Sequence, residues 1–221
     1  MTTINIELVS DFVCPWCDLG RVRLRAALEQ LRRSHPALRF RTNWLPFFLN
    51  PNTPSSGEPY WPFLEAKFGG RGGAEKVLAR VREAAETDGL VFAFERIATR
   101  PNTLNAHRLM YRAQSLGARP EHIDALADAL FDAYFRGGKD IGDLDTLADI
   151  AVACGEKRDP VLAYLTSDRD RAAVQRMADG IARQGVEGVP FFIFDRKLAL
   201  SGAQSAAVIG ATLLQAVQGS D

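Results

Sequence analysis

The sequence has little cysteine and no excess of charge of either sign, and each scarcity excludes a class of protein. Only 3 of the 221 residues are cysteine, too few for the disulfide framework of a small secreted domain. Lys plus Arg and Asp plus Glu number 27 each, so the formal net charge is zero. This balance disfavours a nucleic-acid binder and a polybasic membrane binder. With 47% hydrophobic and 24% charged residues, the composition is that of a folded globular protein.

Long hydrophobic runs are also missing. No segment approaches the roughly 18 apolar residues that a transmembrane helix requires. The first residues, Met1 to Asn5, include no basic residue, and Glu7 and Asp11 interrupt the short apolar stretch that follows. A secretory signal peptide has a basic start and an unbroken apolar core. We therefore expect a cytoplasmic protein that binds neither membrane nor nucleic acid.

The order of the expected elements indicates an α/β fold with an insertion. Residues 4–9 and 38–48 have the pattern of strands on either side of an amphipathic helix, and helical patterns dominate the following 120 residues or so. A strand pair near 189–200 and a closing helix complete the chain. Because both flanks supply parts of one sheet, we predict a thioredoxin fold interrupted by a large helical insertion subdomain. The predicted thioredoxin-like domain comprises residues 1–50 and 186–221. The predicted insertion comprises residues 51–185, and its last helix can pack as part of the thioredoxin fold.

Two of the three cysteines lie in the segment Cys14-Pro15-Trp16-Cys17, directly after the first expected strand. Proline is favoured at the first residue of a helix, so Pro15 predicts Cys14 at the N-cap and Cys17 in the first turn. Unpaired N–H groups and the helix dipole favour a thiolate at a helix start, and one helical turn suits a disulfide. The pattern predicts a redox pair in which Cys14 is an exposed nucleophile and Cys17 the resolving thiol.

Other interpretations of the cysteines are weaker. Half of a zinc site would need two more ligands, and the remaining candidates, Cys154, His35, His107 and His122, lack paired spacing. We therefore predict no metal. Cys154 continues an apolar stripe along its expected helix, which predicts a small buried hydrophobic side chain.

Three segments stand out together: residues 11–17 (DFVCPWC), residues 102–109 (NTLNAHRL), and residues 188–192 (GVPFF) followed by 201–204 (SGAQ). In this order they resemble the FrnE-like branch of the DsbA-type thioredoxin-fold oxidoreductases, over nearly the whole chain. The resemblance implies disulfide reduction, isomerisation or oxidation on disulfide-containing proteins or peptides. It implies no tightly bound cofactor, with glutathione as a candidate redox partner.

The resemblance also implies a substrate site around the cysteine pair. Pro190 is then a cis-proline facing the pair, and the backbone of Val189 pairs with a bound peptide or glutathione. Pro15 and Trp16, between the cysteines, belong to the same site. A proline at the start of a strand donates no N–H, which leaves the neighbouring backbone available to an extended ligand.

The sequence departs from the thioredoxin pattern at Leu8. Thioredoxins carry a buried acid six residues before the first cysteine, which accepts the proton of the resolving thiol, and this chain has Leu8 there. Glu7 and Asp11 are near, but strand alternation predicts that Glu7 points away from the core. The group that deprotonates Cys17 is left open.

Asn102, Thr103 and His107 are weaker candidates for substrate binding. Asn102 and Thr103 are first of all N-cap residues for the helix that follows. His107 shares a helix face with Leu104 and Tyr111, so a hydrogen-bonded core histidine is the favoured interpretation.

Two other functions stay open beside redox exchange. Hydroxychromene-carboxylate isomerases and kappa-class glutathione transferases share this architecture but typically have serine at the first cysteine position. The presence of both Cys14 and Cys17 therefore disfavours a glutathione-dependent isomerase or transferase. A peptide-binding holdase would use the same substrate site without redox turnover. A monomer and a homodimer are both compatible with the sequence.

Overall fold

The computed structural model describes residues 2–218, and the chain divides into two compact units. Unit 1 joins the segment up to Phe47 with the segment from Met177 onward, and unit 2 is Phe48–Arg176. The second boundary lies inside one helix, α8 (Arg171–Arg183). Unit 1 is thus assembled from two segments that unit 2 separates in the sequence.

Unit 1 is built on a mixed sheet with the strand order β2-β1-β5-β6. β1 (Thr2–Ser10) and β2 (Leu38–Pro46) pair in parallel and are joined by α1 (Pro15–Ser34), which confirms the predicted β-α-β start. β5 (Phe191–Phe194) pairs antiparallel with the other edge of β1 and continues through a tight turn into β6 (Leu198–Ser201). β1 is therefore an interior strand, and its two neighbours come from opposite ends of the sequence.

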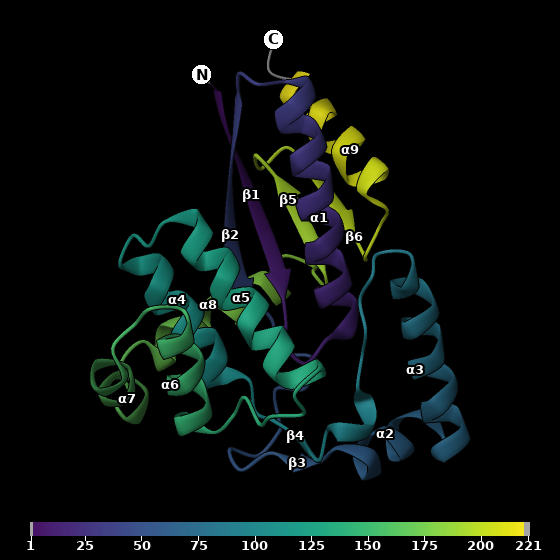
Figure 1. Ribbon diagram of the computed structural model, residues 1–221, viewed down its shortest axis with the longest axis vertical. Coiled ribbons are helices and arrows are strands. Elements are labelled where there is room, and N and C mark those ends of the chain that lie inside the picture. Colours follow the sequence, from purple (N-terminus) through teal and green to yellow (C-terminus); the bar gives the residue numbers. More distant parts are fainter. Residues whose placement is uncertain (1, 219–221) are drawn as a thin grey trace. The chain divides into compact units, whose positions relative to one another are not determined.

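The alternation of side chains along β1 determines what each face of the strand contacts. Leu8 is fully buried and lies in register with Phe192 of β5. On this face α1 approaches the sheet, since a Cβ added to Gly20 would lie 3.3 Å from Cζ of Phe192. Val9 points to the opposite face, where it packs with Ile181 of α8. Figure 1 shows α1 beside the closing helix α9.

Unit 2 is largely helical. Its helices are α2 (Tyr60–Phe68), α3 (Arg71–Glu86), α4 (Leu104–Ser115), α5 (Pro120–Phe135), α6 (Leu144–Ala153) and α7 (Arg158–Thr166), with a single 3-10 turn at Phe94–Arg96. A short antiparallel ladder pairs β3 (Glu58–Pro59) with β4 (Thr99–Arg100). α9 (Ala206–Gln218) belongs to unit 1. Among residues 2–218, no helix is both long and apolar enough to cross a membrane.

The fully buried side chain of Arg108 ties α4 to the end of α7. Its guanidinium donates hydrogen bonds of 2.6–3.0 Å to the carbonyls of Tyr164, Leu165, Ser167 and Arg169. The last carbonyls of a helix have no partners within the helix and lie at the negative end of its dipole, which suits a buried cation. Burial lowers the pKa of Arg108, and these carbonyls compensate for the lost water.

Candidate active site

α1 begins at the cysteine pair. Cys14 is the N-cap residue, with an extended backbone (φ −96°, ψ 112°), and Pro15 is the first helical residue. The N–H of Cys14 donates to the Asp11 carbonyl and the N–H of Cys17 to the Cys14 carbonyl, each at 3.0 Å. The helix start that Pro15 predicts is confirmed, and both cysteines lie within its first turn.

Both thiols are buried, so the prediction of an exposed Cys14 is wrong. Cys14 is 4% exposed and Cys17 is fully buried. The Cys14 thiol donates to the carbonyl of Val189 at 3.7 Å, across 175 residues of sequence. The segment that leads into β5 therefore covers the helix start, and a position at an N-cap does not by itself provide access to solvent. Pro15 and Trp16, which are partly exposed, form the accessible part of the motif.

Val189 and Pro190 directly precede β5 in the sequence. The peptide bond that joins them is cis. Pro190 is buried, and a Cβ added to Gly20 of α1 would lie 2.8 Å from its Cγ. Its carbonyl accepts a hydrogen bond of 2.8 Å from the N–H of Gly202. Unit 1 thus brings Val189 and Pro190, distant in the sequence, to the helix that carries the cysteines.

The pKa of Cys17 reports the surroundings of its thiol, which include Cys14. Burial raises the pKa of Cys17 well above its usual value, and the hydrogen bond and the charge of Cys14 raise it further. The hydroxyl of Ser10 and the backbone N–H of Asp11 lower the pKa of Cys17. In the reduced protein Cys17 is therefore a protonated thiol at neutral pH.

No acid occupies the position that serves as proton acceptor in thioredoxins, since Leu8 is fully buried there. Glu7 forms an ion pair with Arg196, with Oε1 and Nε 3.3 Å apart, on the other face of β1. Asp11 contributes its backbone to Cys17. Sequence reasoning missed Ser10 as a neighbour of Cys17, although its spacing of two residues from Leu8 signals that they share a face of β1.

Asn102 and Thr103 lie at the start of α4, in unit 2. The Oδ1 of Asn102 accepts a 3.0 Å hydrogen bond from the N–H of Leu104, and its Nδ2 donates to the carbonyl of Thr53 at 2.7 Å. Thr103 occupies the N-cap position, but its side chain makes no capping hydrogen bond. Asn102 is thus the residue that caps the helix and anchors the neighbouring loop.

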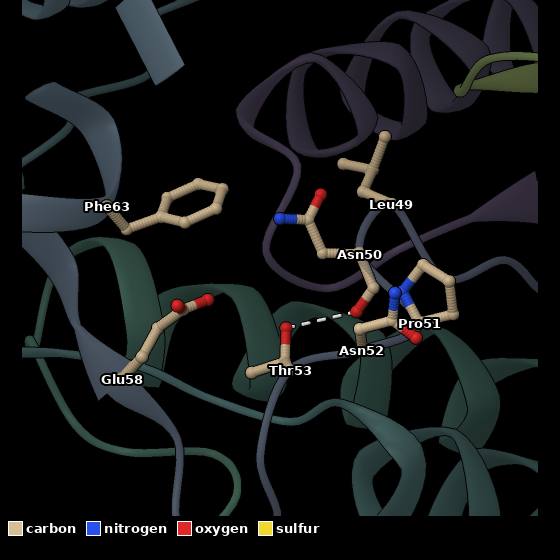
Figure 2. Close-up of a pocket in the computed structure, with 7 residues that line it drawn as sticks. All are labelled: Leu49, Asn50, Pro51, Asn52, Thr53, Glu58 and Phe63. Atoms are coloured by element: carbon tan, nitrogen blue, oxygen red, sulfur yellow. Dashed lines mark hydrogen bonds between the residues drawn. The ribbon is translucent and has the colours of Figure 1, made fainter. Parts of the chain in front are cut away.

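That loop lines a cavity of about 270 Å³ (Figure 2), formed by Leu49, Asn50, Pro51, Asn52, Thr53, Glu58 and Phe63. Arg100, which is buried, donates to the hydroxyl of Thr53 and to Oε1 of Glu58 at 2.9 Å. Its guanidinium also lies 4.1 Å from the centre of the Phe63 ring. The Thr53 hydroxyl and the Glu58 carboxylate in the cavity wall are thus hydrogen-bonded to Arg100. The side chain of Asn102 also binds the backbone of the loop, at the Thr53 carbonyl.

His107 and Cys154 lie elsewhere in unit 2. His107 is 5% exposed and meets the ring of Phe48 edge-on, with centroids 5.3 Å apart. Cys154 is the C-cap residue of α6 and is half-buried, because it follows the last turn of the apolar stripe rather than lying within it. Burial, with the charges of Glu156 and Asp128, raises the pKa of Cys154. Among residues 2–218, no three His, Cys, Asp or Glu side chains lie close enough to hold a metal ion.

Comparison with known proteins assigns the chain to a family. The family model described as "DSBA-like thioredoxin domain" matches residues 5–213. The chain belongs to this family. The predicted α/β fold, a thioredoxin fold with a helical insertion, is thereby confirmed, as is the resemblance to DsbA-type oxidoreductases.

Relatives of this DsbA-like chain extend over most of its length. The protein YwbO of Bacillus subtilis (strain 168) is 25% identical over 154 residues, which are 69% of this chain and 67% of YwbO. A probable DsbA oxidoreductase from Streptomyces coelicolor is 28% identical, with a TM-score of 0.85 over 99% of this chain and 91% of that one. A putative protein disulfide isomerase from Nitrosomonas europaea is 18% identical, with a TM-score of 0.75 over the whole of both chains.

Two further structures show how widely the fold is shared. A 2-hydroxychromene-2-carboxylate isomerase is 15% identical, with a TM-score of 0.67 over 97% of each chain. The cytosolic disulfide reductase DsbM from Pseudomonas aeruginosa, solved with GSH, is 16% identical, with a TM-score of 0.64 over 97% of this chain and 99% of that one. At these identities the likeness concerns the fold alone.

Proposed function

We propose that this DsbA-like protein is a thiol–disulfide oxidoreductase of the FrnE-like branch, with Cys14 as nucleophile and Cys17 as resolving thiol. The observation that carries the proposal is the pair of thiols in the first turn of α1, with Cys14 Sγ 3.7 Å from the Val189 carbonyl. Cys14 holds the N-cap position beside the Val189 carbonyl, whereas Cys17 lies deeper in the first turn, where burial raises its pKa. The two sulfurs therefore differ in the way that the two steps of exchange require.

The reaction proceeds in two exchanges of sulfur. The Cys14 thiolate attacks one sulfur of the substrate disulfide, so that a mixed disulfide forms and the first substrate thiolate leaves. Cys17 then attacks Cys14 Sγ, the Cys14–Cys17 disulfide forms, and the bond to the substrate breaks. The proton of Cys17 leaves with the second substrate thiol. Two electrons pass from the cysteine pair to the substrate, and the reverse sequence oxidises a dithiol.

The substrate is an extended peptide, or glutathione, that lies along Val189. Pro190 donates no N–H, so a ligand strand pairs with the backbone of Val189 beside the Cys14 sulfur. Pro15 and Trp16 are partly exposed and form the other side of the site. The GSH in the DsbM structure supports glutathione as a redox partner. No tightly bound cofactor is needed, since the cysteines themselves carry the electrons.

In the cytoplasm, where we place the protein, the reaction runs as reduction or isomerisation. Even a pair as oxidising as about −120 mV lies about 100 mV or more above the cytosolic glutathione poise. At about 30 mV for each tenfold change in the equilibrium constant, glutathione keeps such a pair reduced. A reduced pair donates electrons to substrate disulfides.

A glutathione-dependent isomerase is the second candidate, and the fold shared with 2-hydroxychromene-2-carboxylate isomerase favours it. Such an enzyme activates the glutathione thiol and needs no resolving cysteine. The two candidates therefore make opposite predictions for Cys17→Ala.

Covalent trapping separates them. In Cys17→Ala, Cys14 attacks a disulfide and nothing in the motif resolves the adduct, so mixed disulfides with protein or glutathione accumulate and disappear with reductant. Non-reducing electrophoresis and intact mass measure them. Cys14→Ala is expected to form none, and Cys154→Ala, which lies outside unit 1, should exchange at the wild-type rate.

The oxidoreductase assignment fails if Cys17→Ala forms no adducts. It fails equally if both single variants keep full activity in a small-molecule, glutathione-dependent isomerisation. Peptide binding that survives loss of both cysteines would instead indicate a holdase.

A further inference from the structure

Cys17 has to lose a proton to act, and the structure places no acid at the position thioredoxins use, which is Leu8. Ser10, the last residue of β1, is 1% exposed and shares the Leu8 face of the strand, because residues two apart point the same way. That face is the one approached by α1, the helix that carries Cys17. The Ser10 carbonyl accepts a 3.0 Å hydrogen bond from the N–H of Phe47, which fixes this end of the strand.

The Ser10 hydroxyl lies near enough to Cys17 to lower the pKa of that thiol. Among residues 2–218, however, the Oγ of Ser10 has no hydrogen-bond partner in the reduced protein. A buried hydroxyl without a hydrogen-bond partner destabilises a fold relative to alanine. Packing therefore does not explain a serine at this place, whereas a charged sulfur would, since hydrogen bonds to ionised acceptors are the stronger ones.

We propose that Ser10 is a further catalytic residue, whose hydroxyl donates to Cys17 Sγ and stabilises the Cys17 thiolate as it attacks the mixed disulfide. This role rests on the proposed function. In the step it assists, the Cys17–Cys14 S–S bond forms and the bond from Cys14 to the substrate sulfur breaks. The substrate thiolate takes the electron pair and the proton that Cys17 has lost. Ser10 keeps its own proton throughout.

The contributions to the pKa of Cys17 change when the mixed disulfide forms. In the reduced protein, burial and the Cys14 thiol raise this pKa, and Ser10 and the Asp11 N–H lower it. In the mixed disulfide Cys14 carries neither proton nor charge, so both of its contributions disappear. Burial is then opposed by Ser10 and Asp11, and Cys17 becomes easier to ionise at the step in which it must react.

A disulfide with a coloured leaving group measures the two steps separately. With 5,5′-dithiobis(2-nitrobenzoate) and the reduced full-length protein, attack by Cys14 releases the first coloured thiolate and attack by Cys17 releases the second. In Ser10→Ala the first release should match the wild type, and the second should slow about tenfold at pH 7. Plots of log rate against pH should run parallel for the two proteins below the pKa of Cys17, offset by that factor, and converge above it.

Stability and a conservative variant provide the controls. Ser10→Ala should unfold at the same or a higher urea concentration than the wild type, because it removes a poorly satisfied hydroxyl, whereas a merely structural serine would lower the midpoint. Ser10→Thr keeps the hydroxyl and should restore the second step. Ser201→Ala removes an exposed hydroxyl from β6 of the same sheet and should change neither step. In the unmodified protein, the Ser10 Cβ resonance should follow the titration of Cys17, a readout that requires no variant.

The outcomes distinguish the role of Ser10 from the proposed function. A wild-type second step in folded Ser10→Ala, or a Ser10 resonance that ignores the titration of Cys17, overturns the role of Ser10 alone. A wild-type protein that never releases the second thiolate overturns the resolving role of Cys17, and the role of Ser10 with it.

Discussion

Replacing Gly20 by alanine should destabilise unit 1, although alanine is the better helix former. Gly20 lies inside α1, one turn after Cys17, and an added Cβ would lie 2.8 Å from Cγ of Pro190. The same Cβ would lie 3.3 Å from Cζ of Phe192. Favourable carbon–carbon contacts begin at about 3.5 Å, so α1 would have to move by about 0.7 Å. Neither neighbour can easily yield, since Pro190 is a closed ring and Phe192 is fully buried.

Two effects of opposite sign decide the magnitude. Removing a glycine from a helix interior gains about 1 kcal/mol. Overpacking a well-packed contact costs about 1–3 kcal/mol. The net result is a loss of up to about 2 kcal/mol. Disulfide exchange should also slow, because the displaced helix carries Cys14 away from the Val189 carbonyl.

A second glycine in the same unit provides the matched control. A Cβ added to Gly210 of α9 meets only the Cβ of Ala27, at an ordinary 3.9 Å, so Gly210→Ala should gain up to about 1 kcal/mol. Urea unfolding of the two reduced variants and the wild type gives the comparison. If Gly20→Ala were as stabilising as Gly210→Ala, the close approach of α1 to Pro190 would be wrong.

Two further predictions concern buried groups. Arg108→Lys should cost about 2–4 kcal/mol in unfolding free energy, because a lysine cannot reach all four carbonyls at the end of α7. The control Arg158→Lys, at an exposed pair with Asp145 and Asp149, should leave the urea midpoint nearly unchanged. Burial raises the pKa of Cys17, so the unfolded chain loses this proton at a lower pH than the folded one. Under reductant, stability should therefore be full below about pH 8.5 and fall above it, by up to about tenfold in the unfolding equilibrium constant per pH unit. Urea midpoints at pH 7.5 and 9.5 measure this fall, and Cys17→Ala should show a smaller one; equal falls in both proteins would contradict the burial of Cys17.

Local features of the site could be predicted from the sequence. Pro15 indicates the first residue of α1, and the alternation along residues 4–9 indicates β1, because each depends on neighbours within a few residues. The parallel pairing of β1 with β2 follows from the helix between them. The family resemblance supplied the prediction that these patterns do not, namely that a proline so distant in the sequence lies beside the cysteine pair.

Contacts between segments that are distant in the sequence could not be predicted from local patterns. The burial of Cys14 depends on Val189, 175 residues away, and no local pattern encodes that cover. In the sequence, Asn102 and Thr103 are equally good N-cap residues. The structure shows that the Asn102 side chain donates to the Thr53 carbonyl and accepts from the N–H of Leu104, and this depends on the backbone at the start of α4. Cys154 is half-buried and not fully buried as predicted, because α6 ends at the residue before it.

The interior position of β1 has a consequence for folding during synthesis on the ribosome. β1 lies between β2, which follows it closely in the sequence, and β5, which begins at Phe191. At a synthesis rate of roughly 5–20 residues per second, the ribosome adds β5 about 10–40 s after β1. Unit 2, a compact unit encoded in between, can fold during that interval. Until Val189 emerges, the nascent chain presents an open strand edge and a Cys14 thiol without its cover. The arrangement that shields the reactive sulfur in the finished protein thus leaves it accessible to the surrounding thiols for most of its synthesis.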